Sequence, residues 1–131
     1  MAGGMGAYIA LMRPKNLVLA GATVPLGAYF ALMDTSEAFP FVAVTLHTLA
    51  VMLFTGAGNA MNDIKDAEID KTAHPMRPLP SGQLTLSQAG RFTSLLWVLS
   101  VAAHVGGLMA VEAAVSCLLY TSDAADDTSG V

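Results

Sequence analysis

The chain alternates long apolar runs with short polar segments. Uncharged windows of 18 to 25 residues occupy positions 16–33, 38–62 and 92–111. At about 1.5 Å rise per residue, even the shortest window forms a helix of roughly 27 Å, close to the roughly 30 Å hydrocarbon core of a bilayer. The pattern predicts an all-α fold in which the chain crosses a membrane several times.

Local signals set the ends of the predicted helices. The helices are expected at 14–33, 40–66 and 86–111, with a loop at 67–85 and a mixed, partly disordered or interfacial start at 1–12. Pro14 suits the first turn of a helix. Thr85 and Gln88 have the spacing of a capping box, which predicts that the third helix begins just after Thr85.

Composition supports a membrane protein over a soluble bundle with buried helices. The 131 residues are 54% hydrophobic and only 12% charged, with a mean hydropathy of +0.58. A soluble domain typically has about 25% charged residues. The six basic residues form no stripe suited to nucleic acid.

The basic residues predict the orientation. All six lie before the first window or between the second and third: Arg13, Lys15, Lys65, Lys71, Arg77 and Arg91. Basic residues accumulate on the cytoplasmic side of membrane proteins. We therefore expect the N-terminus and the 67–85 loop in the cytoplasm, in a multi-pass plasma-membrane protein. The first apolar run is longer than the core of a signal peptide, so cleavage is not expected.

An acidic segment follows the second window, where the chain reads Asn-Asp-Ile-Lys-Asp-Ala-Glu-Ile-Asp from Asn62 to Asp70. On a helix, Asn62, Asp66 and Asp70 share one face, as do Asp63, Asp66 and Asp70. Like charges at this spacing destabilise a helix unless a cation binds them. Carboxylate and amide oxygens are the ligands that Mg²⁺ prefers, usually together with phosphate and water. The segment predicts a Mg²⁺ site, with Glu68 turned away toward Lys65 or Lys71.

The end of the chain has a different character. Residues 117–131 resemble the translation of a sequencing-library adapter, so we expect native sequence to stop near Ser116. Asp123 and Asp127 are excluded as a second metal motif, because a full membrane thickness would separate them from Asp66 and ligands must converge on one ion.

The acidic segment and the loop after it carry a resemblance. Asn62-Asp63-x-x-Asp66-x-x-x-Asp70, followed by Arg-Pro-x-Pro-Ser-Gly from Arg77, resembles the first motif of the UbiA superfamily of intramembrane prenyltransferases. The resemblance covers roughly residues 10–112. Within the superfamily, the motif is most similar to archaeal enzymes that make digeranylgeranylglyceryl phosphate, and chlorophyll-synthase-like members are also similar.

The resemblance implies a bundle of about nine helices, of which this chain holds the N-terminal three, and a second Asp motif beyond Ser116. It implies that Asp66 and Asp70 are catalytic and that four side chains hold Mg²⁺ with a diphosphate, namely Asn62, Asp63, Asp66 and Asp70. Lys71, Arg77 and Asn16 would contact the diphosphate or the acceptor. The chain alone is then expected to be inactive.

The implied reaction is Mg²⁺-dependent transfer of a prenyl group, geranylgeranyl in the archaeal case, from an allylic diphosphate to geranylgeranylglyceryl phosphate. An aromatic, chlorophyll, quinone or haem precursor is the alternative acceptor. A CDP-alcohol phosphotransferase would need an Asp-Gly-x-x-Ala-Arg pattern that Asp66 to Asp70 lacks. A transporter or assembly subunit would not need the Arg-Pro-x-Pro-Ser-Gly loop. His47 and His104, within the apolar windows, are expected at helix interfaces.

Overall fold

Five helices make up the computed structural model, which describes residues 3–129, with side chains apart from 118 and 121–129. The helices are α1 (Met5–Met12), α2 (Pro14–Leu32), α3 (Phe41–Lys65), α4 (Ala67–Ala73) and α5 (Leu86–Ser129). Asp123, Asp127 and residues 130–131 of the predicted adapter tail lie outside the part of the chain whose side chains are described.

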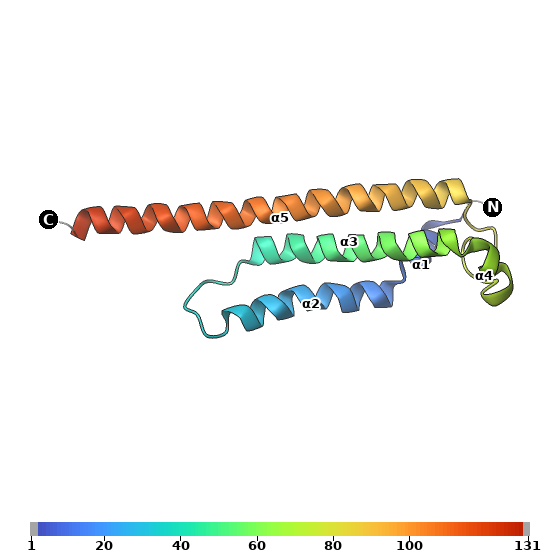
Figure 1. The fold of residues 1–131 in the computed structure, drawn as a ribbon, viewed down its shortest axis with the longest axis horizontal. Helices are drawn as coiled ribbons and strands as arrows, with labels where there is room; N and C mark the ends of the chain where they lie inside the picture. The colour runs from blue at the N-terminus through green and yellow to red at the C-terminus, as the bar shows by residue number, and fades with distance from the viewer. Residues whose placement is uncertain (1–2, 130–131) are drawn as a thin grey trace.

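The long helices α2, α3 and α5 run side by side in alternating directions (Figure 1). Helix α3 packs against both α2 and α5. Three stretches are long and apolar enough to cross a membrane, Pro14–Leu32, Phe41–Lys65 and Leu86–Cys117, and at most 28% of each apolar window is buried. Such helices suit surroundings of lipid or further helices. The predicted all-α, multi-pass fold is confirmed.

The structure also contains two short helices, α1 and α4, that were not predicted. Residues 5–12 form α1 rather than a partly disordered start, because Ala7 and Leu11 bury one side of the helix. The predicted 67–85 loop contains α4, in which Glu68 and Asp70 occupy the first turn. Acidic residues there stabilise the positive end of the helix dipole.

Helix α5 runs beyond the predicted end at residue 111, to Ser129. Between residues 111 and 129 the chain has no proline or glycine to end the helix. Its start was predicted correctly. The Thr85 backbone N–H donates to Gln88 Oε1 over 2.9 Å and the Gln88 N–H donates to Thr85 Oγ1 over 3.1 Å. These two bonds make a capping box.

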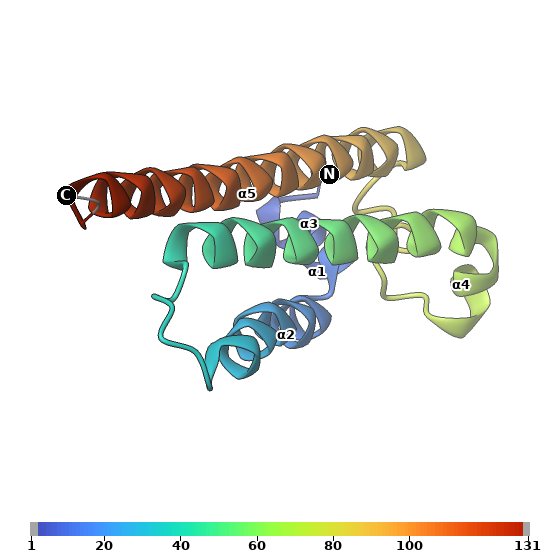
Figure 2. The ribbon, with the colours of Figure 1, turned by 60° about the vertical axis from the view of Figure 1, so that its left-hand side comes forward.

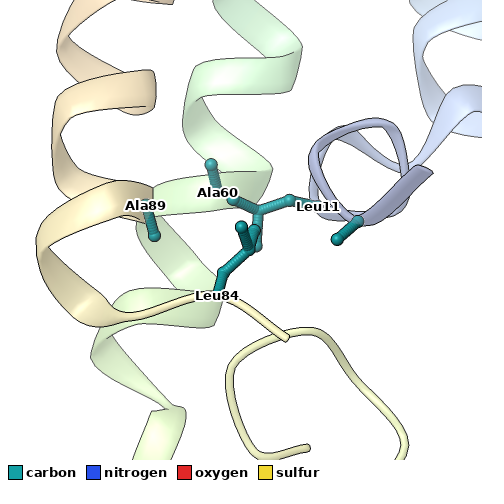
Figure 3. Packing of buried hydrophobic residues seen from close by; sticks show 5 residues of the cluster. Leu11, Ala60, Leu84 and Ala89 are labelled. Carbon is teal, nitrogen blue, oxygen red and sulfur yellow. The ribbon is translucent and has the colours of Figure 1, made fainter. Parts of the chain in front are cut away.

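Helix α1, the end of α3, α4 and residues 74–85 gather at one end of the bundle, here called the α4 end (Figure 1). Figure 2 shows α4 at the end of α3 from another side. A small core lies there, in which Leu11 and Leu84 contact the alanines of α3 and α5 (Figure 3). Leu11, Ala60 and Ala89 are fully buried, and Leu84 is 2% exposed. This core joins α1 and the loop to the two long helices.

Small and polar residues bring α3 and α5 together at several points of their interface. The rings of His47 and His104 meet edge to face, with centroids 4.9 Å apart. Ser100 Oγ donates to the Ala50 carbonyl over 2.8 Å. A Cβ atom on Gly107 would lie 2.4 Å from the His47 ring, so only glycine permits this approach. The interface position predicted for both histidines is confirmed.

Candidate functional site

Charged side chains are concentrated at the α4 end of the bundle. Helix α3 ends at Lys65, and Asp66 leaves helical geometry with φ −91° and ψ 5° before α4 begins. The Asp66 N–H still donates to the Asn62 carbonyl and the Asp70 N–H to the Asp66 carbonyl. The acidic segment is thus two helical pieces joined at Asp66 and not one continuous helix.

Asp63 is buried among basic groups. It is 4% exposed. Its Oδ1 accepts a hydrogen bond from Arg13 Nη2 over 2.5 Å and lies 3.7 Å from Arg77 Nη1. Two guanidinium groups therefore meet one carboxylate, which keeps this buried charge compensated.

Asp70 is the second buried acid. Its Oδ2 accepts from Arg77 Nη1 over 2.6 Å. The loop that carries Arg77 folds tightly on itself: the Ser81 N–H donates to the Arg77 carbonyl over 3.0 Å, and Gly82 adopts a positive φ of 77°. Glycine tolerates that conformation without strain. The Arg-Pro-x-Pro-Ser-Gly loop thus holds Arg77 between two aspartates.

Asn62 and Asp66 are exposed. Within the described residues, neither side chain makes a hydrogen bond or an ion pair. Their oxygens are therefore open to a ligand from solution. The four residues predicted to bind metal divide into two pairs, one held by arginines and one open.

The two other predicted contact residues, Lys71 and Asn16, bond to different partners. Lys71 Nζ donates to both carboxylate oxygens of Glu68, at 2.8 and 2.9 Å, as predicted for Glu68. Asn16 is exposed in the first turn of α2, where its backbone N–H donates to the Arg13 carbonyl over 2.9 Å.

A cavity of about 510 Å³ opens between the α1–α2 junction and the loop after α4. Its polar lining comes from Arg13, Asp63, His74 and Arg77. Asn62, Asp66 and Asp70 do not line it. The arginine-lined cavity and the open oxygens are therefore separate features of the same end.

The sequence analysis assigned no binding role to Arg13, which the structure places in this cavity. Arg13 has φ 56°, and it is the one non-glycine residue with a positive φ in the described chain. Residues on one face of α3 hold the α1–α2 junction in this position. Asn59 Nδ2 donates to the Met12 carbonyl over 2.8 Å, and a Cβ on Gly56 would lie 2.8 Å from the end of the Met12 side chain. The available signal was an arginine directly before Pro14, at the predicted start of the first long helix.

Comparison with known protein families matches residues 16–122 to the UbiA prenyltransferase family. The chain belongs to this family. Together with three helices of membrane-spanning length, the family assignment makes the chain an integral membrane protein. UbiA prenyltransferases generally use a divalent metal.

Several curated members of the UbiA family resemble the chain. It is 40% identical over 108 residues to digeranylgeranylglyceryl phosphate synthase of Methanosarcina mazei, covering 76% of this chain and 37% of the relative. It is 37% identical over 102 residues to the enzyme of that name from Methanococcoides burtonii, covering 74% and 36%. It is 32% identical over 117 residues to the enzyme of that name from Methanosphaera stadtmanae, covering 89% of this chain and 40% of the relative.

The chain thus spans 36% to 40% of the length of these relatives. No solved structure matches it.

The open oxygens of this UbiA member fit a metal that also binds substrate. Within the described residues, no three His, Cys, Asp or Glu side chains gather to hold a metal ion. Mg²⁺ often takes only one or two carboxylates and completes its shell with water and substrate phosphate. Asn62 and Asp66 supply an amide and a carboxylate oxygen free of other partners. The donor set fits that kind of site.

Proposed function

We propose that this chain forms the N-terminal third of a prenyltransferase that moves a geranylgeranyl group to geranylgeranylglyceryl phosphate. One observation of the structure carries the proposal: unpartnered oxygens of Asn62 and Asp66 lie at the same end as a cavity lined by Arg13 and Arg77. The relatives named digeranylgeranylglyceryl phosphate synthase support the choice of substrates.

In this proposal Asn62, Asp66 and Asp70 would hold Mg²⁺ with the donor diphosphate, and Arg77 would exchange its bond to Asp70 for phosphate. Bound there, Mg²⁺ would offset the negative charge of the departing diphosphate. Arg77 would add charge-assisted hydrogen bonds to phosphate oxygens of the diphosphate or of the acceptor. Lys71 and Asn16 would contact the substrates at the edge of the site. Asp63 would have a supporting role.

The reaction breaks the bond between the first carbon of the prenyl chain and the diphosphate oxygen. The acceptor hydroxyl forms the new ether bond to that carbon, and its proton passes to solvent. An apolar cavity of about 360 Å³ lies along α3 and α5, lined by residues such as Phe54 and Val101. Such a surface suits an isoprenoid chain and excludes water from the reacting carbon.

Orientation is part of the proposal. Helix α1, α4 and the loop carrying Arg77 share one end of the bundle (Figure 1), together with the first turns of α2 and α5. By the positive-inside rule we place this end in the cytoplasm. The open oxygens and the arginine-lined cavity would then meet soluble Mg²⁺.

The decisive experiment uses a full-length protein that carries this sequence, purified in detergent. Labelled geranylgeranyl diphosphate and geranylgeranylglyceryl phosphate are supplied with Mg²⁺ or with EDTA. We expect labelled ether lipid only with Mg²⁺. Failure to form it, or equal yield in EDTA, would contradict the proposal. An aromatic acceptor serves as the comparison, and preference for it would overturn the choice of acceptor. The 131-residue chain alone is expected to form no product.

A further inference from the structure

Asp63 has surroundings that do not suit a metal ligand. Its Oδ1 contacts Arg13 Nη2 and lies 3.7 Å from Arg77 Nη1. A cation approaching this oxygen would be repelled by two guanidinium groups at close range. Asn62 and Asp66, by contrast, face no basic partner in the described residues. The buried position of Asp63 therefore suits another task.

Arg13 is fixed from several directions. Gly56, Asn59 and Asp63 lie three and four residues apart on α3 and so share one face. Gly56 lies close to the Met12 side chain, and Asn59 donates a hydrogen bond to the Met12 carbonyl. Asp63 binds the side chain of the next residue, Arg13. Such support from several partners is what a preorganised binding group needs.

Both arginines keep donors for a ligand. A guanidinium has five N–H donors, and the hydrogen bonds to Asp63 and Asp70 use one nitrogen of each arginine. The side chains of Arg13 and Arg77 are 35% and 31% exposed, and both line the 510 Å³ cavity. Paired guanidinium groups are suited to the oxygens of a phosphate.

We infer that Asp63 is a positioning residue, and that Arg13 and Arg77 form a metal-independent site for a phosphate monoester, the phosphate of the acceptor. The inference rests on the proposed function for the identity of the acceptor. The donor diphosphate travels with Mg²⁺ and needs the open oxygens of Asn62 and Asp66, which lie outside this cavity. Two sites would hold the two anionic substrates apart and limit their mutual repulsion.

Binding without metal tests this site directly. The full-length protein is titrated with glycerol 1-phosphate in EDTA by calorimetry, which involves neither Mg²⁺ nor turnover. We expect saturable binding that Arg13→Gln and Arg77→Gln each weaken about tenfold or more, the loss expected for a charge-assisted hydrogen bond. Absence of binding, or binding unchanged in both variants, would overturn the site while leaving Mg²⁺-dependent prenyl transfer to be judged separately.

Asp63→Asn distinguishes three possible roles of Asp63, because a simple charge effect, a positioning role and a metal-ligand role each predict a different change in glycerol phosphate binding. Removing a negative charge near an anion site should tighten anion binding if the charge acts alone. A positioning role requires the opposite, a loss of about tenfold in EDTA, with partial rescue by Asp63→Glu. Tighter binding would contradict the inference. So would unchanged binding, which is expected of a pure metal ligand.

Controls exclude general unfolding and the wrong anion. Glu68→Gln removes an exposed acid from the same segment and should leave glycerol phosphate binding unchanged; if it weakened binding as much as Asp63→Asn, the inference would fail. Asp63→Asn added to Arg13→Gln should cost little more than Arg13→Gln alone, because Asp63 acts through Arg13. Full additivity would count against the inference. If inorganic pyrophosphate in EDTA used this site and glycerol 1-phosphate did not, the assignment to the acceptor would be wrong.

Discussion

The α4 end and the α3–α5 interface both place polar side chains beside apolar helix surfaces, but they use them differently. At the interface, His47 Nδ1 lies 2.8 Å from the Ala43 carbonyl and Ser100 donates to the Ala50 carbonyl. Both groups bond to backbone carbonyls of α3, His47 within its own helix and Ser100 across the interface. At the α4 end, Arg13 and Arg77 share Asp63 and still present N–H groups to a cavity.

The difference suggests how to separate packing from binding in a membrane helix. A polar residue that serves packing has its hydrogen-bonding groups occupied by helix backbone, because an unpaired polar group in hydrocarbon is costly. A residue that binds a ligand keeps unused hydrogen-bond donors or acceptors at an accessible surface. The following variants test this contrast, from the largest expected effect to the smallest.

Asp66→Ala should have the largest effect, and on activity. Its carboxylate has no partner in the described residues, so its loss removes a proposed metal ligand without breaking a structural bond. We expect prenyl transfer by the full-length protein to fall about 10²–10³-fold, as when one group that stabilises transition-state charge is removed. Initial rates at saturating Mg²⁺ measure this. Glu68→Ala, at an exposed acid two residues away, is the matched control and should retain activity. Equal losses in both variants would contradict the assignment.

Arg77→Gln should reduce stability at the α4 end, in addition to the loss of phosphate binding expected above. It leaves the buried Asp70 carboxylate, 4% exposed, without its guanidinium partner. A buried charged group left unpaired costs about 3 kcal/mol. Unfolding in detergent by sodium dodecyl sulfate would measure the loss, with Arg91→Gln as an exposed control. Adding Asp70→Asn should restore part of the stability, since no charge then remains unpaired. A double variant no more stable than Arg77→Gln would disprove this explanation.

Gly107→Ala tests the α3–α5 interface against its neighbour Gly106→Ala. The new Cβ at 107 would lie 2.4 Å from the His47 ring, whereas at 106 it would lie 3.6 Å from Leu46 Cδ1, an ordinary contact. We expect Gly107→Ala to cost about 1–2 kcal/mol through overpacking and Gly106→Ala to cost nothing measurable. Thermal unfolding in detergent gives the comparison. Similar melting temperatures for the two variants would show that the interface can shift freely.

Ser100→Ala should have the smallest effect. It removes the bond to the Ala50 carbonyl, and hydrogen bonds between membrane helices average about 0.6 kcal/mol. Ser94→Ala, whose Oγ bonds within its own helix to the Gly90 carbonyl, is the control. The same unfolding assay should resolve the two. A loss of several kcal/mol for Ser100→Ala would mean that this bond does more than assist packing.

The sequence predicted the long elements well because their signals are physical and local. Uncharged runs of membrane length marked α2, α3 and the start of α5, and the pattern at Thr85 and Gln88 marked a helix start that the hydrogen bonds confirm. Helices α1 and α4 escaped prediction. Each has eight residues or fewer, too short to form without tertiary contacts such as those of Leu11.

The candidate site was only partly predictable. Helical spacing grouped Asn62, Asp66 and Asp70, but spacing cannot show which acid an arginine from a distant segment will neutralise. Arg13 and Asp63 are 50 residues apart in sequence. Their pairing depends on how the α1–α2 junction lies against α3, which no local pattern encodes. Whether the four residues bind Mg²⁺ stays a prediction.

The small core at the α4 end also has a consequence for biogenesis. Leu11, Ala60, Leu84 and Ala89 come from widely separated parts of the chain yet form one cluster (Figure 3). During synthesis, Leu11 leaves the ribosome long before Ala89, so α1 must wait at the membrane surface while two further spans are inserted. Arg13, which directly follows α1, stays in water until α3 is inserted and Asp63 can pair with it. Its charge would thus first hold the nascent chain at the membrane surface, and only later become part of the finished site.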